Sequence, residues 1–203
     1  VEELVHGLGK GLISYLPIGP DGPEPPARPV LERAYHLSYP FVFAHEGAVF
    51  MVPESLGPKR VELYRAVDFP ERWTLEAVLL DGIAASDATI VEERGRLYMF
   101  ATVSDEDASS WDALHVWTAE RLTGPWRPLP GNPVVIDALA ARSAGAFYRR
   151  GGALYRPAQD CRTGYGAGLA LARVDRLDPD AFSQTVEKVI HPQGAWPGLA
   201  LHT

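Results

Sequence analysis

The sequence is poor in cysteine, in long apolar runs and in positive charge. Its single cysteine, Cys161, excludes an internal disulfide framework and a zinc site built from several cysteines. No apolar run approaches the roughly 18 to 20 residues that cross a bilayer, so no transmembrane segment is expected. The 19 Lys and Arg residues are outnumbered by 26 Asp and Glu residues, which gives a formal net charge of −7. Such a chain is not expected to bind nucleic acid, because phosphate backbones attract positive surfaces.

The composition is that of a folded chain with many turns. Hydrophobic residues make up 46% of the 203 residues and charged residues 22%, which excludes intrinsic disorder and provides a sizeable core. The 19 glycines and 18 prolines exceed average usage and indicate frequent turns. No capping residue is followed by an apolar stripe of helical period, so the sequence favours strands over helices.

A motif recurs three times along the chain, in residues 39–54, 87–102 and 144–159. Each copy consists of a short apolar strand, a turn that ends in glycine, and a second strand with an aromatic residue three positions after that glycine. The intervals between the turn glycines are 48 and 57 residues, and periods of this order are typical of repeat architectures. The three turn glycines are Gly47, Gly95 and Gly152.

Further apolar stretches follow each copy of the motif. The third stretches cover 61–67, 113–119 and 167–174, and in two copies a fourth stretch begins at Trp73 or Trp126. Four short strands per repeat, separated by turn residues, are typical of a β-propeller blade. A β-sandwich would also contain such strands, but it would have no reason to repeat the same register of strand, glycine and aromatic residue.

We therefore expect a single all-β domain over residues 1–203, a β-propeller of about five blades of four antiparallel strands. At roughly 50 residues per blade, five blades require about 250 residues, so the N-terminal blade is expected to be incomplete. The expected segments are a partial blade at 1–19, whole blades at 36–80, 84–136 and 142–191, and the inner strand of a further or closing blade at 197–203.

Several short motifs of the chain carry a resemblance to a known family. They are His36–Phe43, Pro53–Ser55, Glu62–Arg65, Asp87–Thr89, Gly124–Trp126, Asn132–Pro133, Ala141–Gly145, Arg156–Asp160 and Leu201–Thr203. Together they resemble the propeller domain at the N-terminus of plant glucosamine inositolphosphorylceramide transferases, over about residues 1–203. Bacterial relatives of that domain occur alone or beside formyltransferase-like domains. The resemblance implies that a further segment of the propeller domain lies before Val1.

More distantly, the repeat resembles the five-bladed propellers of glycoside hydrolase family 43 and of the invertase and levansucrase group. Those enzymes carry carboxylates on inner strands around a central funnel, and Asp87 opens an inner strand as theirs do. A later blade of those hydrolases presents an acidic proton donor. This chain has Arg142, Ser143, Ala144 and Gly145 there instead, which argues against ordinary hydrolase chemistry.

Three carboxylates are candidates for a catalytic role. Asp87 opens an inner strand, and residues in such positions converge on the axis of a propeller. Glu54 and Asp160 end second strands and would project toward the same mouth. A glycosidase uses two carboxyl groups, one to protonate the leaving oxygen and one to attack or to activate water. The alternative roles are turn capping for Asp87, a solvated strand edge for Glu54 and turn bonding for Asp160.

Five other residues are candidates for substrate binding. Arg142 would clamp an anionic group of the ligand, or else hold one of the acidic candidates in a structural ion pair. His36 and His202 open inner strands and would act as acid and base, as ligands of a central metal ion, or as hydrogen-bonded structural residues. Gln159 ends a second strand beside the same mouth. Trp111 lies in a polar loop, where it would stack on a sugar ring or fold back onto the core.

The sequence thus predicts a carbohydrate-active propeller domain, similar to glycoside hydrolases, that acts on or binds a glycan or a sugar-containing lipid head group in the axial funnel. The open alternative is a non-catalytic glycan-binding or scaffold module of a larger glycosyl- or formyltransferase, so enzymatic activity is not decided. A propeller used only for protein contacts is a third reading. We expect no cofactor, and no metal site is indicated. The single cysteine is compatible with a cytoplasmic location, which the sequence does not fix.

Overall fold

The computed structural model describes residues 1–104 and 109–192. All regular secondary structure in these two ranges is β, and they contain no helix, so the all-β prediction is confirmed. Consequently, no helix able to cross a bilayer is found in the described part of the chain. The chain divides into two compact units, Val1–Ala84 and Ala85–Thr203, each built from antiparallel sheets.

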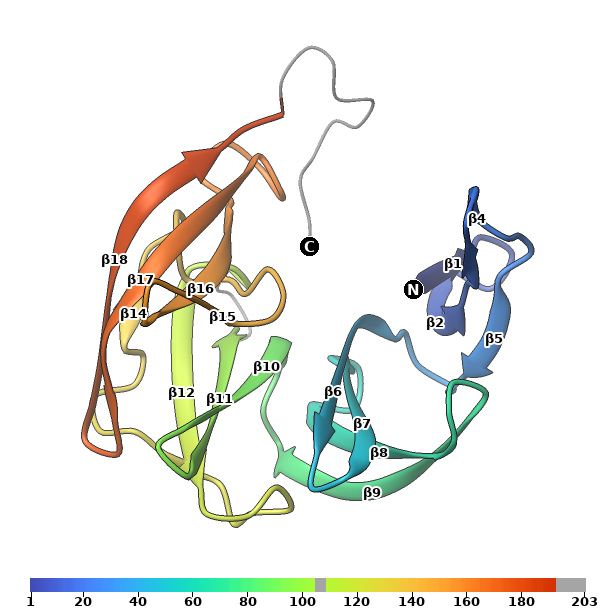
Figure 1. Cartoon of the computed structure of the whole chain (residues 1–203), viewed down its shortest axis with the longest axis horizontal. Helices are drawn as coiled ribbons and strands as arrows, with labels where there is room; N and C mark the ends of the chain where they lie inside the picture. The colour runs from blue at the N-terminus through green and yellow to red at the C-terminus, as the bar shows by residue number, and fades with distance from the viewer. Residues whose placement is uncertain (105–108, 193–203) are drawn as a thin grey trace. The chain divides into compact units, whose positions relative to one another are not determined.

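The first unit contains a three-stranded sheet in the order β1-β2-β5 and a four-stranded meander in the order β6-β7-β8-β9 (Figure 1). A small hairpin, β3-β4, lies between the second and third strands of the first sheet along the chain. The strands are β1 Glu2–Val5, β2 Lys10–Tyr15, β3 Ile18–Gly19, β4 Gly22–Pro23, β5 Arg28–Leu31, β6 Ser38–His45, β7 Ala48–Glu54, β8 Arg60–Asp68 and β9 Arg72–Asp81.

The core of the first unit forms between these two sheets. Strands β2, β7 and β8 contain runs of four or five consecutive buried residues, and successive side chains point to opposite faces, so one face of each sheet can be buried against the other. Ile13 and Leu31 contribute from the first sheet, Met51 and Tyr64 from the second, and Leu37 from the connection between them. All five are at most 4% exposed.

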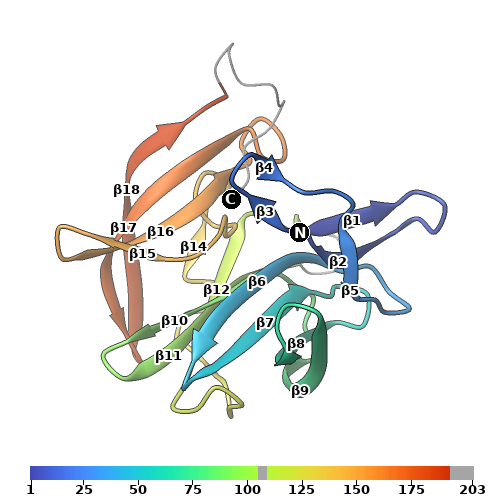
Figure 2. The ribbon, with the colours of Figure 1, turned by 45° about the vertical axis from the view of Figure 1, so that its right-hand side comes forward.

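The second unit contains two sheets, one of five strands and one of four. One is β10-β11-β12-β13 with β14 pairing beside β13 on β12, and the other is β15-β16-β17-β18. Figures 1 and 2 show the second of these as a separate, strongly twisted sheet beside β12. The strands are β10 Ala85–Glu93, β11 Arg96–Val103, β12 Ala113–Ala119, β13 Arg127–Pro128, β14 Val135–Ile136, β15 Tyr148–Arg150, β16 Ala153–Asp160, β17 Gly168–Asp178 and β18 Ala181–Ile190.

Facing sides of these two sheets form the core of the second unit. The ring of Phe100 on β11 lies at its centre, 4.9 Å from the ring of Phe147 and 5.1 Å from that of Phe182. Leu114 and Val116 of β12 are fully buried in the same cluster. Because two sheets share one apolar layer, neither sheet has to be stable alone.

The glycine of the repeated motif is explained by the turn that it closes. In all three copies the residue before the glycine and the glycine itself have positive φ angles, as a two-residue type I′ hairpin turn requires. Glycine adopts such angles without a steric penalty, so it marks the turn in the sequence. The φ values are 47° and 77° at Glu46 and Gly47, 52° and 73° at Arg94 and Gly95, and 58° and 80° at Gly151 and Gly152.

The fourth strand of the β10 sheet differs from the sequence prediction. The stretch from Trp126 was expected to be a continuous strand, but it consists of two-residue pieces, β13 and β14, on either side of a proline-rich segment. Proline cannot donate to a ladder, so the strand breaks there. The side-chain amide of Asn132 takes the place of the missing backbone group: it donates to the carbonyl of Val116 and accepts from its amide, both at 2.9 Å.

Candidate functional site

Asp87 is positioned by a β-bulge at the start of β10. The ladder between β10 and β11 shifts register between Ser86 and Thr89, and Asp87 has a φ of 52°. Aspartate tolerates this left-handed conformation better than most residues, and bulges turn a side chain away from the regular alternation of the strand. The same shift and a φ of 41° occur at Tyr39, the residue that the repeat aligns with Asp87.

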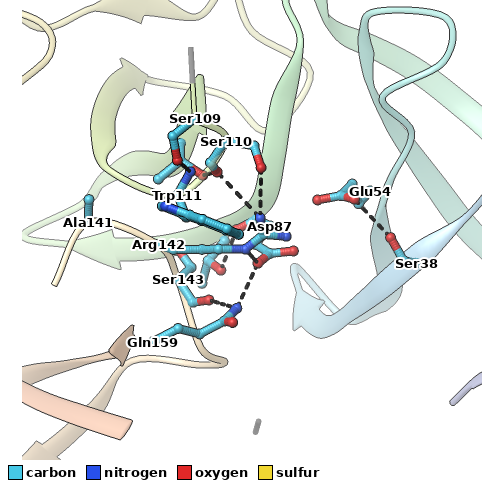
Figure 3. Close-up of polar contacts among 12 residues, drawn as sticks. Ser38, Glu54, Asp87, Ser109, Ser110, Trp111, Ala141, Arg142, Ser143 and Gln159 are labelled. Carbon is cyan, nitrogen blue, oxygen red and sulfur yellow. Dashed lines mark hydrogen bonds and ion pairs between the residues drawn. The ribbon is translucent and has the colours of Figure 1, made fainter. Parts of the chain in front are cut away.

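The Asp87 carboxylate lies in a buried ion pair with Arg142. The Arg142 Nε donates to Asp87 Oδ2 at 2.6 Å, and the Gln159 amide nitrogen donates to the same oxygen at 2.9 Å (Figure 3). The side chains of Asp87 and Arg142 are only 2% and 8% exposed. Because a guanidinium and a second N–H donor both favour the charged carboxylate, the arrangement holds Asp87 as an anion.

Arg142 connects this pair to a loop and to an exposed aromatic ring. Its terminal nitrogen donates to the hydroxyl of Ser110 at 3.2 Å and more weakly to the Ser110 carbonyl at 3.4 Å. The guanidinium carbon lies 5.0 Å from the centre of the Tyr165 ring, which is 51% exposed. Trp111 follows Ser110 directly and is half-buried. Aromatic surface and a charged, hydrogen-bonded group are thus brought together in the second unit.

The backbone that carries Arg142 is fixed from β16. Arg156 is fully buried and donates to the carbonyl oxygens of Ala140, at 2.8 Å, and Ala141, and to the hydroxyl of Ser143, at 3.2 Å. Gln159 also donates to the Ser143 carbonyl, at 2.9 Å. These bonds hold residues 140–143 on both sides of Arg142, so the direction of its guanidinium is set by β16.

Asp160 forms a second ion pair. Gln159 and Asp160 are neighbours on β16, so their side chains leave opposite faces of the strand. Both carboxylate oxygens of Asp160 accept from the Arg162 guanidinium at 2.9 Å, and the Arg162 backbone amide donates at 3.2 Å. The hydrogen bonds from Arg162 lower the pKa of Asp160, although burial acts against them. Asp160 is therefore charged at neutral pH and is a poor proton donor.

We expect the variant Arg162→Gln to lower the free energy of unfolding by about 1 kcal/mol near pH 7. The folded-state pKa of Asp160 is depressed below its usual 3.8, so the stabilisation is present above that value and is lost as the pH falls through the folded pKa. Arg162 is half exposed, and solvent screening keeps the effect small. Denaturant unfolding of both proteins between about pH 7 and pH 2 measures it. A pH-independent loss would show that Arg162 acts through packing.

Glu54 and His36 belong to the first unit. Glu54 ends β7, is 8% exposed and accepts a hydrogen bond from the Ser38 hydroxyl at 2.9 Å (Figure 3). His36 Nδ1 accepts from the Gly11 backbone amide at 2.8 Å, and its Nε2 lies 3.7 Å from Glu2. A side chain on Gly11 would collide with the Leu37 carbonyl, so the close approach requires glycine. These contacts give His36 a structural role in attaching β2.

Other sequence candidates contribute less to the site. His202 lies outside the described residues. Burial raises the pKa of the Cys161 thiol, so Cys161 is not a ready nucleophile. In residues 1–104 and 109–192, no group of three or more His, Cys, Asp or Glu side chains could hold a metal ion. Ser110, Tyr165 and Arg156 were not predicted from the sequence as site residues. Gly164 and Gly166 flank Tyr165, and an aromatic residue between two loop glycines is a signal that could have identified it.

Several solved structures to which this chain is similar are GH43 proteins. A GH43 protein from Bacillus licheniformis superimposes with a TM-score of 0.60 at 20% identity, over 96% of this chain and 42% of that one. A GH43 enzyme from Xanthomonas citri in complex with xylose gives 0.55 at 13% identity, over 74% of this chain and 54% of that one. At these identities the likeness shows a shared propeller-like all-β fold.

Curated relatives are considerably more similar in sequence. Glucosamine inositolphosphorylceramide transferase 1 from Oryza sativa subsp. japonica is 34% identical over 180 residues, which cover 85% of this chain and 24% of that protein. The Arabidopsis thaliana protein of the same name is 32% identical over 182 residues, or 85% of this chain and 23% of that protein. The chain thus spans about a quarter of the length of these relatives.

Residues 28–203 match the family described as glucosamine inositolphosphorylceramide transferase 1, N-terminal. The match includes the Asp87–Arg142 and Asp160–Arg162 ion pairs, β16 and the loop that carries Trp111. This chain belongs to the family of the N-terminal domain of glucosamine inositolphosphorylceramide transferase 1.

Proposed function

We propose that this chain is a propeller domain of about five blades that binds a glycan, or the sugar-containing head group of a lipid, within a larger transferase, without cleaving it. The binding surface is formed around Arg142, with Trp111 and Tyr165 as its aromatic part. Two findings support the proposal: the family to which the chain belongs, and the ion pairs in which arginines hold the acidic candidates Asp87 and Asp160 of the second unit.

The buried Asp87–Arg142 pair is the observation that carries the proposal. A glycosidase needs one carboxyl group that can give up a proton and another that is free to attack the sugar or to activate water. Asp87 accepts two N–H donors on one oxygen, and Asp160 accepts two from Arg162. Neither is available as a proton donor, and both would have to break an ion pair to act as nucleophiles. Their role in a binding site would be indirect: each carboxylate orients an arginine that can contact the ligand.

The aromatic residues provide the apolar half of a sugar site. Carbohydrate rings have C–H faces that pack on aromatic side chains, while their hydroxyls need fixed polar partners. Tyr165 presents half of its surface to solvent and packs against the Arg142 guanidinium. A ring that is held from one side by a buried ion pair loses little freedom when a ligand packs on the other.

We expect Tyr165→Ala and Trp111→Ala each to weaken glycan binding by roughly 3- to 10-fold, since aromatic contacts of this kind contribute about 0.5–1.5 kcal/mol. A glycan array with the wild-type chain identifies the ligand, and calorimetric titration measures the affinities. Tyr148→Ala is the matched control, because the Tyr148 ring stacks on Tyr155 at the other end of β16. Equal losses in all three variants would contradict a site beside Arg142.

Hydrolysis is the second candidate function, because the fold is that of family 43 enzymes and Glu54 is a nearly buried carboxylate with a hydroxyl partner. The same preparation decides between the two. Sugar release from a panel of aryl xylosides, arabinosides, galactosides and glucosaminides is expected to be absent. Turnover by the wild type that disappears in Asp87→Asn or Glu54→Gln would overturn the binding-module proposal.

A further inference from the structure

The second unit contains a hollow lined by arginine, the arginine hollow. It has a volume of about 330 Å³ and is bordered by Arg96 at the start of β11, by Thr118 at the end of β12 and by the loop and short strand that hold Arg121 and Arg127. Glu120 is the one acidic residue on its wall. The wall therefore carries a net charge of +2 in a chain whose overall charge is −7.

Two of these cations lack an acidic partner among the described residues. Arg96 pairs with Glu120 at 3.3 Å, but Glu120 is 82% exposed, and a pair so open to solvent contributes little. Neither Arg121 nor Arg127 forms an ion pair within 1–104 or 109–192. Converging arginines without carboxylate partners repel one another and favour an anion between them.

Another hollow of the unit, about 240 Å³ in volume, shows the opposite arrangement. Its arginines are neutralised in place: Arg149 and Arg94 pair with Glu93, and Arg176 pairs with Asp178. The contrast indicates that the positive charge of the arginine hollow is a local feature and does not follow from arginine content alone.

The wall of the arginine hollow is held rigidly. The Gly124 amide donates to the Arg121 carbonyl at 2.9 Å, and the Trp126 indole donates to the Leu122 carbonyl at 3.1 Å from a buried position. Arg127 pairs with Thr118 in the ladder between β12 and β13. The arginine side chains thus start from fixed backbone positions, so a ligand does not have to order the loop.

We propose that this hollow binds a phosphate group. Guanidinium groups match the oxygens of phosphate in pairs, and three of them around one small hollow supply both the charge and the donors. The site is distinct from the Asp87 cluster. In the ladder between β10 and β11, Arg96 lies opposite Glu93. Glu93 is six residues from Asp87, or roughly 20 Å along β10. The proposal of a phosphate site therefore does not depend on the proposed glycan site.

The test compares two double variants with the same change in net charge. Arg121→Gln/Arg127→Gln removes the unpaired cations, and Arg149→Gln/Arg176→Gln removes two paired ones from the neutral hollow. Calorimetric titration with inorganic phosphate at constant ionic strength is expected to show binding by the wild type in the millimolar range or tighter, weakened at least about tenfold in the first variant and unchanged in the second.

A second arm distinguishes free phosphate from a lipid head group. Flotation with phosphatidylcholine vesicles, with and without phosphatidylinositol, is measured for the same three proteins. Binding to phosphatidylinositol vesicles that depends on Arg121 and Arg127 assigns the phosphate to a lipid, whereas binding of inorganic phosphate alone assigns it to a soluble ligand. Equal effects of the two double variants, or no binding in either arm, would overturn the proposal. Thermal unfolding confirms that each variant is folded.

Discussion

Replacing Arg142 with methionine is expected to lower the free energy of unfolding by about 3–5 kcal/mol. The substitution removes the guanidinium but keeps most of the aliphatic volume. Asp87 would then remain as a buried carboxylate that has lost its guanidinium partner and keeps the Gln159 amide as a donor. Removing the opposite charge from a buried ion pair is among the most destabilising changes that a single substitution produces.

A double-mutant cycle separates the charge pair from packing. Asp87→Asn removes the negative charge, and asparagine tolerates the positive φ of this position, so the backbone of the bulge is kept. Asp87→Asn combined with Arg142→Met is expected to cost less than the sum of the single variants by roughly 1–3 kcal/mol. Denaturant unfolding of the four proteins measures the coupling.

Arg149→Met is the matched control for Arg142→Met. Arg149 also pairs with a carboxylate, that of Glu93, but its side chain is 54% exposed. A surface pair contributes at most about 1 kcal/mol, so this variant should unfold nearly as the wild type does. If Arg142→Met behaved in the same way, the Asp87–Arg142 pair would not be desolvated, and the main argument against a catalytic Asp87 would be removed.

The strand pattern could be predicted from the sequence because it depends on local rules. The third apolar stretches at 61–67, 113–119 and 167–174 correspond to β8, β12 and β17. Short apolar stretches and turn glycines are features of a few consecutive residues, so they can be recognised without knowledge of the partner strand. The prediction of a continuous fourth strand from Trp126 was wrong, because the side chain of Asn132 replaces backbone pairing there. A side chain that bonds in place of a backbone group leaves no periodic pattern in the sequence, so it could not be predicted.

The candidate site could be predicted from the sequence only in part. Asp87, Arg142 and Gln159 were selected because each stands near the end of a strand, and the structure brings their side chains into contact. Their roles could not be assigned, because whether an arginine clamps a ligand or a carboxylate depends on distances between strands. The sequence analysis left both readings of Arg142 open, and the structure places it against Asp87. The role of Asp160 likewise depends on Arg162, two residues away on a turn.

Arg156 escaped the sequence analysis because a charged residue on a strand normally marks the exposed face. It lies instead on the same face of β16 as the buried residues Leu154 and Ala158, and it is fully buried itself. Its guanidinium carbon is 5.8 Å from the centre of the Phe100 ring, so the aromatic core covers one face of the group. Its nitrogens serve backbone carbonyls, an arrangement that only the folded chain reveals.

Arg156→Met is expected to lower the free energy of unfolding by about 3–5 kcal/mol. The variant leaves the Ala141 carbonyl without its Arg156 donor and removes the bond to the Ser143 hydroxyl, and each loss of this kind costs about 1–3 kcal/mol. The Ala140 carbonyl also loses its bond to Arg156 but keeps one from the Gln184 side-chain amide at 3.0 Å. Arg156→Lys should fall between the wild type and the methionine variant, because an ammonium can serve one carbonyl but cannot span both. Denaturant unfolding ranks the three proteins.

The control for Arg156→Met is Arg173→Met on the neighbouring strand β17. Arg173 is 41% exposed and pairs with Asp175 and Glu187 at the surface, so its loss should cost less than about 1 kcal/mol. Equal costs would mean that Arg156 is not an internal support. Glycan affinity gives the second readout, measured at temperatures where both variants are folded. Because Arg156 fixes the backbone on either side of Arg142, affinity should fall in Arg156→Met and stay unchanged in Arg173→Met, even though neither residue contacts the proposed ligand.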